Sequence, residues 1–238
     1  MKRRYEVLDI LRGFALLNMI IYHACWDLVY LFDVSLPWYH STGAYIWQHC
    51  ICHTFIVLSG FCACFGKNPI KRGLFVLACS AVVSVGASFA GTTICFGVLT
   101  LLGFGQLFYG LFNKVLNKIG SYIGAGISLL AFVLSRQVPN GTFAGMTLPS
   151  FLYANHFTAL LGFPHNAFRS SDYFPLVPWL FLFAFGVFLR RIFAKHDLMR
   201  YLHTKHFSLL GLCGKYSLYL YMLHQPLTYG MLLILFSI

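Results

Sequence analysis

Long apolar stretches dominate this sequence and restrict the folds that it can adopt. Several of them come close to the roughly 20 residues that an α-helix needs to cross the hydrocarbon core of a bilayer. The seven stretches cover residues 8–32, 44–65, 73–91, 94–112, 121–135, 175–193 and 216–236. Only 10% of the 238 residues are charged, against about 25% in soluble domains. The sequence therefore predicts an all-α, polytopic membrane helix bundle with about seven transmembrane helices.

A further apolar piece, residues 148–163, lies between the fifth and sixth stretches. It is shorter than a membrane-crossing helix and is bordered by proline and glycine, so we expect an interfacial or re-entrant helix there. An eighth transmembrane helix is the alternative. Residues 138–143 can extend the short fifth stretch. Because no internal repeat or low-complexity linker divides the chain, we expect residues 1–238 to form a single transmembrane domain.

The distribution of basic residues predicts the orientation of the helices. With seven crossings, 14 of the 17 Lys and Arg residues fall on the side that holds the N-terminus, and only Arg136 and Arg169 fall on the other. The last one, Arg12, lies within the first stretch. Because cytoplasmic loops are enriched in Lys and Arg, the N-terminus is expected in the cytosol and the C-terminus outside. Topology thus accounts for the net charge of +11, and no nucleic-acid partner is expected.

Ionisable residues within the first stretch point to a function, because such groups are costly inside a membrane. The set consists of Asp9, Arg12, His23 and Asp27. On a helix with about 3.6 residues per turn, Arg12 and His23 share nearly one face and lie about 16 Å apart along the axis. Asp9 is one turn from Arg12, and Asp27 is one turn from His23. One stripe therefore carries an acid–base pair near each membrane surface, unless both pairs are ion pairs that only hold helices together.

Other histidines lie in or beside the apolar stretches. His49 and His53 are one turn apart, a spacing that can bind a metal, but no further ligands accompany them and we expect no metal site. His224 and Gln225 precede a proline that should interrupt the last helix near its middle, because proline removes a backbone donor. They are expected to line a cavity, with helix packing as the alternative. His40 lies in the first outer loop, where simple solvation is the alternative to a role.

An aromatic segment with two prolines, residues 168–179, precedes the sixth stretch on the predicted outer side. Asp172 adds a negative charge to it, and Tyr173 and Trp179 add aromatic rings. We expect this segment to form a rigid rim outside the membrane. A belt of interfacial aromatic residues is the alternative.

Several motifs occur together in one order along the chain. Ten residues separate Arg12 from His23, and Asp27 follows one turn later. The later motifs are Phe55-x-x-x-Ser59-Gly60, Phe96-Gly97-Val98-Leu99, Asp172-Tyr173-Phe174-Pro175-Leu176-x-Pro178-Trp179 and Ser217-Leu218-x-x-Tyr221-x-x-His224-Gln225-Pro226. This ordered set resembles the heparan-α-glucosaminide N-acetyltransferase-like family of transmembrane acyltransferases, as a small member. The resemblance extends from end to end of the chain.

The resemblance implies transfer of an acetyl or other acyl group from cytosolic acyl-CoA to an amine or hydroxyl of an extracytoplasmic acceptor, such as an amino sugar or glycan. Attack on a thioester needs a base that takes a proton, and a neutral imidazole suits this role. His23 is the expected catalytic base, and Asp27 the residue that orients it. His40 and His224 are the alternative bases. An acetyl-histidine intermediate stays open as a second route.

The phosphates of CoA need cations at the cytosolic mouth. The expected acyl-CoA contacts are Arg12, Lys67, Lys71 and Arg72. The expected acceptor contacts are Asp172, Tyr173, Trp179 and Gln225. Acetyl-CoA would act as a co-substrate, and no permanently bound cofactor is expected. The expected partners are the lipid bilayer, acyl-CoA, the glycan or amino-sugar acceptor and a possible homodimer mate, and the expected location is the cell membrane.

Two other functions would use the same buried residues. A transporter or flippase would use them for the passage of substrate or protons, although the absence of an inverted repeat counts against it. A haem or metal electron carrier would use His23, His49, His53 and His224 as ligands. A Soret band in the purified protein would identify that carrier.

Overall fold

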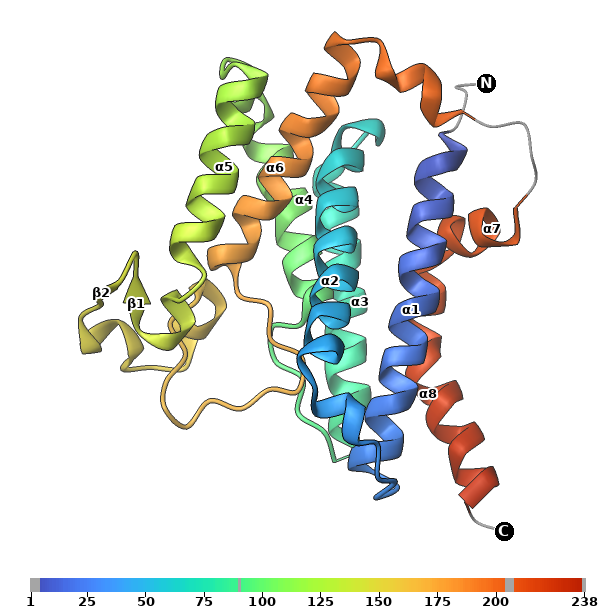
Figure 1. Cartoon of the computed structure of the whole chain (residues 1–238). Coiled ribbons are helices and arrows are strands. Elements are labelled where there is room, and N and C mark those ends of the chain that lie inside the picture. The colour runs from blue at the N-terminus through green and yellow to red at the C-terminus, as the bar shows by residue number, and fades with distance from the viewer. Residues whose placement is uncertain (1–4, 90, 204–207, 237–238) are drawn as a thin grey trace. The chain divides into compact units, whose positions relative to one another are not determined.

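Helices form nearly all of the regular structure in the computed structural model, which describes residues 5–89, 91–203 and 208–236 (Figure 1). The α-helices within these residues are α1 (Glu6–Tyr30), α2 (Thr42–Cys62), α3 (Pro69–Phe89), α4 (Val98–Leu116), α5 (Ser121–Ser135), α6 (Leu176–Lys195), α7 (Leu209–Lys215) and α8 (Ser217–Phe236). All except the short α7 belong to the 7 helical segments that are long and apolar enough to cross a membrane. The predicted all-α, polytopic helix bundle is therefore confirmed.

Short elements connect these helices. A two-stranded antiparallel hairpin, β1 (Thr142–Phe143) and β2 (Met146–Thr147), follows α5. The 3-10 turns are η1 (Pro37–His40), η2 (Ala63–Phe65), η3 (Val138–Asn140), η4 (Ser150–Tyr153), η5 (Phe157–Leu161) and η6 (Leu198–Leu202).

Residues 148–163 contain two of these turns, η4 and η5, so neither a continuous helix nor an eighth transmembrane helix forms there. Pro149 directly precedes η4. The side chain of Asn155 accepts hydrogen bonds from the backbone of Phe157 and Thr158 (2.9 and 3.0 Å) and so starts a new turn. Gly162, with a φ of 118°, ends that turn in a conformation that favours glycine. These local signals break the segment before it can become a long helix.

The ends of several helices differ from the predicted ones. α4 begins at Val98, later than predicted, because Asp172 accepts a hydrogen bond from the Val98 backbone N–H (3.0 Å) and caps the helix. α3 begins earlier, at Pro69, since a proline in the first helical turn has no donor to lose. The predicted interruption of the last helix was wrong, because α8 continues through Pro226.

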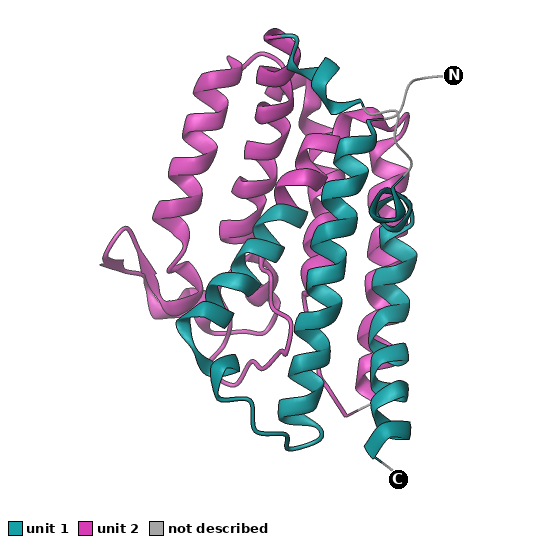
Figure 2. Cartoon of the chain, turned by 45° about the vertical axis from the view of Figure 1, so that its right-hand side comes forward, with its two compact units in different colours: residues 1–55, 197–238 teal, residues 56–196 magenta. Residues whose placement is uncertain are grey.

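The chain consists of two compact units (Figure 2). Unit 1 comprises residues 1–55 and 197–238, which hold α1, the first part of α2, α7 and α8. Unit 2 comprises residues 56–196, which hold the end of α2 and the helices α3 to α6. That the whole chain works as one transmembrane domain stays a prediction.

In unit 1, α1 packs against both α7 and α8. Gly13 of α1 and Gly214 of α7 let their two helices approach closely. A Cβ on Gly214 would overlap the carbonyl oxygen of Asp9, and a Cβ on Gly13 would overlap that of Leu210. α1 and α8 run in the same direction (Figure 1), and the rings of Phe32 and Phe236, beyond or at their C-terminal ends, lie 5.0 Å apart.

In unit 2, α6 packs against α4 and α5. Phe183 of α6 is fully buried, and Gly105 of α4 leaves the space that its ring occupies. Phe188, one helical turn and a half further along α6, occupies the space above Gly124 of α5. Burial of such large side chains stabilises unit 2 from within.

Candidate active site in unit 1

Helices α1 and α8 bring the predicted residues of unit 1 into one cluster. The rings of His23 and His224 lie nearly perpendicular, with their centroids 5.0 Å apart. Asp27 is fully buried, and its carboxylate accepts hydrogen bonds from Nε2 of Gln225 (2.5 Å) and from Oγ1 of Thr228 (3.5 Å). Four of these five residues were predicted from the sequence as catalytic or acceptor-binding candidates.

Backbone hydrogen bonds determine which ring nitrogens can accept a proton. Nδ1 of His23 lies 2.9 Å from the carbonyl oxygen of Met19, and since a carbonyl only accepts, Nδ1 is the donor. A neutral His23 then carries its lone pair on Nε2. Nδ1 of His224 donates in the same way to the carbonyl of Tyr221 (2.5 Å). Its Nε2 is buried and has no hydrogen-bond partner among the residues that the structure describes.

Asp27 does not form the expected hydrogen bond with His23. The carbonyl of Met19 already occupies Nδ1 of that ring, because a helical histidine can reach the carbonyl one turn earlier. Asp27 instead fixes the Gln225 amide: an ionised carboxylate only accepts, so the amide nitrogen faces Asp27 and Oε1 faces away. Oε1 is buried without a partner within the described ranges. Asp27 still lies close enough to His23 for an electrostatic interaction.

His40, an alternative base, lies exposed at the end of η1. Its ring contacts Tyr30 edge-on at 6.1 Å. In the described part of the chain no hydrogen bond or ring contact joins it to His23. The structure thus brings His224, and not His40, into contact with the predicted base.

Arg12 forms the predicted pair with Asp9 on α1. Its Nη1 lies 3.4 Å from Oδ1 of Asp9, and Asp9 is 5% exposed. The side chain of Arg12 is 26% exposed, so part of the guanidinium stays accessible. The basic residues Lys2, Arg3, Arg4 and Lys205, which entered the prediction of orientation, lie outside the described residues.

The other predicted cations belong to unit 2. Lys67 and Lys71 are exposed. Arg72 is held by the protein, because it donates to Oε1 of Gln106 and to the carbonyl of Ala63 (2.6 Å). Gln106 in turn donates to Ser59 (3.2 Å), so Arg72 ties α2, α3 and α4 together at one end.

Three of the predicted rim residues make contacts that support the fold of unit 2. Asp172 caps α4, as described above. Trp179 packs its ring against those of Phe132 and Phe174, with centroids 5.5 and 5.0 Å away. Tyr173 donates from its hydroxyl to the carbonyl of Ala159 (2.6 Å), and burial raises the pKa of its phenol.

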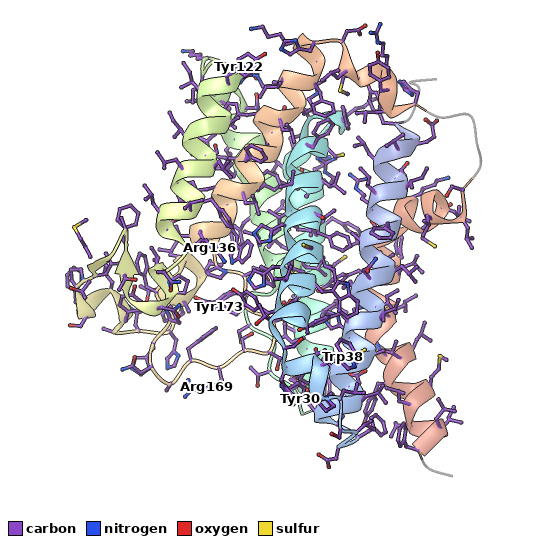
Figure 3. The ribbon with its side chains drawn as sticks, in the orientation of Figure 1. Tyr30, Trp38, Tyr122, Arg136, Arg169 and Tyr173 are labelled. Carbon is purple, nitrogen blue, oxygen red and sulfur yellow. The ribbon has the colours of Figure 1, made fainter. Side chains whose placement is uncertain are left out.

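Tyr173 also lines an open cleft of about 350 Å³ in unit 2, within the size range of small-molecule sites. Figure 3 shows its side chain and that of Arg169 at the loop that leads into α6. The lining residues are Pro139, Asn140, Pro164, His165, Asn166, Phe168, Arg169, Ser170 and Tyr173. Arg169 is the single charged residue of this lining, and sequence analysis did not assign it a role.

The two histidines of α2, His49 and His53, form hydrogen bonds with backbone carbonyls of their own helix. Nδ1 of His49 donates to the carbonyl of Tyr45 (3.0 Å), and Nδ1 of His53 donates to the carbonyl of His49 (2.5 Å). Among the described residues, no group of three or more His, Cys, Asp or Glu side chains could hold a metal ion.

Sequence analysis missed Thr228, whose hydroxyl approaches Asp27 and also donates to the carbonyl of His224 (2.9 Å). A polar residue one turn after His224, on an otherwise apolar helix, was the available signal. Sequence analysis also missed the network of Arg72, Gln106 and Ser59, which joins residues far apart in the chain.

Fold and site together define a multi-pass helical membrane protein with two imidazoles and a carboxylate clustered within its helices. The family model of the catalytic region of heparan-alpha-glucosaminide N-acetyltransferase matches residues 4–226, so the chain belongs to this family of membrane N-acetyltransferases. The resemblance inferred from the motifs is thereby confirmed. No curated protein and no solved structure matches the chain.

Proposed function

We propose that the protein transfers an acetyl or other acyl group from cytosolic acyl-CoA to an amine or hydroxyl of an extracytoplasmic acceptor, such as an amino sugar or glycan. Membership of an N-acetyltransferase family supports the acyl chemistry. The observation that carries the proposal is His23: its Nδ1 is bonded to Met19, which leaves Nε2 free to accept a proton within a membrane helix. We also propose the cell membrane as the location.

His23 acts as the general base in this proposal. Its Nε2 takes a proton from the attacking amine or hydroxyl while the new bond to the acyl carbon forms. The C–S bond then breaks, and the proton passes to the departing sulfur to give free CoA. The negative charge of Asp27 stabilises the intermediate imidazolium electrostatically. An acetyl-histidine route would use the same Nε2 atom as the nucleophile.

The acceptor is proposed to contact Gln225, whose buried Oε1 faces away from Asp27. Tyr173, which lines the cleft of unit 2, is proposed as a further acceptor contact. Asp172 and Trp179 contribute by holding the segment that carries Tyr173, through the cap of α4 and the aromatic contacts of α6.

Transfer across a membrane is the test of this function. Purified protein in lipid vesicles should move label from acetyl-CoA on one face to an amino sugar or glycan on the other. The matched panel pairs each amino sugar with the same sugar that carries a hydroxyl in place of the amine. Transfer only between substrates on one face would contradict the proposed direction. Binding of acetyl-CoA without transfer to any acceptor would contradict the function itself.

Arg12 is proposed to contact the phosphates of acyl-CoA, together with Lys67 and Lys71 from the loop after α2. Arg12→Ala should weaken acyl-CoA binding about 10- to 100-fold, the effect of losing one charge-assisted hydrogen bond. Arg12→Lys should restore only part of this affinity, because lysine lacks the planar fork. Calorimetry with a non-hydrolysable acyl-CoA measures both variants.

The variant Asp9→Asn removes the ion pair with Arg12 but keeps the Arg12 guanidinium. It therefore tests whether Arg12 affects acyl-CoA affinity by binding the ligand or only by pairing with Asp9. If Arg12 binds phosphate, this variant keeps its acyl-CoA affinity; if Arg12 only holds α1 through Asp9, both variants lose affinity alike. Arg200→Ala is the matched surface control, since Arg200 pairs with Asp197 at the same 3.4 Å and the same spacing in sequence but is 64% exposed. Its affinity should not change.

A further inference from the structure

His224 is the buried histidine that the proposed reaction leaves without a role. It is 7% exposed, and its Nε2 has no hydrogen-bond partner among the described residues. Because Nδ1 donates to Tyr221, Nε2 of the neutral ring carries a lone pair and can only accept. A buried acceptor left unpaired destabilises the fold. Its presence therefore points to a ligand that donates a proton or a hydrogen bond there.

The titratable groups around His224 come from the helices packed against it. α1 contributes His23, ring to ring, and Asp27, which is held through the neighbouring Gln225. α8 itself contributes Tyr221, whose ring lies 5.3 Å from that of His224. Cys213 of α7 packs in the apolar cluster around Leu16, and no contact joins it to His224 among the described residues. Asp27 is the carboxylate of this set, and the set contains no Lys or Arg.

Three polar atoms of the residues in this cluster share one property, which is that they accept hydrogen bonds. Nε2 of His23, Nε2 of His224 and Oε1 of Gln225 each carry a lone pair and need a donor. Asp27 adds a negative charge beside them. An ammonium group, with three N–H donors and one positive charge, complements such a set. A hydroxyl has a single proton to donate and would leave two of the three acceptors unpaired.

An amine acceptor must lose two protons to become an amide. At neutral pH a sugar amine is largely an ammonium ion, which has no lone pair and cannot attack a carbonyl. The first proton must leave before attack, and the second leaves while the C–N bond forms. His23 alone provides one proton acceptor for two successive losses.

We propose that His224 is a second general base, which takes the first proton from the ammonium group of the acceptor through Nε2. His23 then takes the second proton as the amine nitrogen bonds to the acyl carbon. The C–S bond breaks, the proton on His23 passes to the sulfur, and the proton on His224 is released to water. Ammonium and thioester thus give amide, thiol and one free proton. This inference rests on the proposed function and narrows its acceptor to a primary ammonium.

Two acceptors whose amines differ in protonation at neutral pH test the role of His224. Glucosamine is largely protonated at neutral pH, whereas methoxyamine is a weak base and is already neutral. With glucosamine, His224→Gln should lower kcat/KM about 100- to 1,000-fold at neutral pH, the usual contribution of a positioned base. The loss should disappear as the pH is raised, because the amine then loses its proton to water. With methoxyamine, the same variant should resemble the unaltered protein at neutral and alkaline pH.

Two matched variants complete the experiment. His23→Gln should lose turnover with both acceptors at every pH, because the second proton must leave in either case. His49→Gln should change neither, although His49 makes the same bond from Nδ1 to a backbone carbonyl. Equal losses of His224→Gln with both acceptors, or a loss that persists at alkaline pH, would assign His224 to the fold alone. Unchanged turnover with glucosamine would also overturn the proposal.

A second measurement does not depend on turnover. In protein labelled with ¹⁵N-histidine, without acetyl-CoA, glucosamine should shift the His224 nitrogen signals toward those of an imidazolium, and methoxyamine should not. The spectrum of His224→Gln assigns the signals. If they do not move with glucosamine, His224 takes no proton from an ammonium ligand. Failure of the unaltered protein to transfer acetyl to any acceptor would instead contradict the proposed function, and the two failures are thus distinguishable.

Discussion

Replacement of His23 by alanine is expected to abolish acyl transfer, with kcat lowered at least about 100- to 10,000-fold. The variant removes the Nε2 that is proposed to take the proton of the attacking group, and no neighbouring side chain occupies the same position. Acyl-CoA affinity should stay close to that of the unaltered protein, because the proposed phosphate contacts lie on Arg12 and the loop after α2. Single-turnover transfer and calorimetry measure the two properties separately.

His40→Ala is the matched control for this prediction. His40 is an exposed histidine with edge-on ring contacts to Tyr30 and Tyr39, so its loss should leave turnover nearly unchanged. If His23→Ala kept substantial turnover while His40→Ala lost it, the base would lie in the outer loop. Thermal unfolding must show that His23→Ala is folded, since the variant also loses the bond to Met19.

Gly214→Ala is expected to be the most damaging addition of a single methyl group in unit 1. Its Cβ would overlap the carbonyl oxygen of Asp9, which is backbone and cannot rotate away, so α7 must separate from α1. The loss of stability should exceed the roughly 1–3 kcal/mol that ordinary overpacking costs. The effect is measured by thermal unfolding in detergent, with the loss of monodisperse protein as the readout.

Gly230→Ala is the matched control, because Gly230 lies in α8 with nothing within 4 Å of an added Cβ. It should be neutral or slightly stabilising, as alanine favours the helix over glycine. Gly13→Ala, which meets the carbonyl of Leu210, should act like Gly214→Ala, and the double variant should lose less than the sum because both disrupt one interface. Similar unfolding temperatures for Gly214→Ala and Gly230→Ala would contradict this account of the packing.

The helices of this protein could be predicted because hydropathy is a local property. Whether a run of residues is apolar enough to cross a membrane depends only on that run, so hydropathy located all the long helices. The start of α4 could not be predicted, because its cap comes from Asp172, 74 residues away from Val98. The helix expected in residues 148–163 does not form, because a hydrogen bond of Asn155 and the backbone conformation of Gly162 interrupt the segment. A count of apolar residues detects neither feature.

The members of the site could be predicted, but their pairing could not. His23, Asp27, His224 and Gln225 are conspicuous because each is polar within an apolar stretch. Helical spacing suggested that Asp27 would bond to His23, yet the carbonyl of Met19 competes for the same ring nitrogen. Arg72 likewise looked available for a phosphate, and its bonds to Gln106 and Ala63 became visible only in the folded chain.

The bond between Asp27 and Gln225 joins residues 198 positions apart and has a consequence for the order of synthesis. A ribosome that adds about 5–20 residues per second needs roughly 10–40 s to make the intervening chain. During that time α1 must reside in the membrane with a carboxylate whose partners on α8 do not yet exist, a costly state in lipid. The last helix therefore completes both the burial of this charge and the cluster around His23. A nascent chain that already carries the residues from Arg12 to Asp27 would stay inactive until α8 has been inserted.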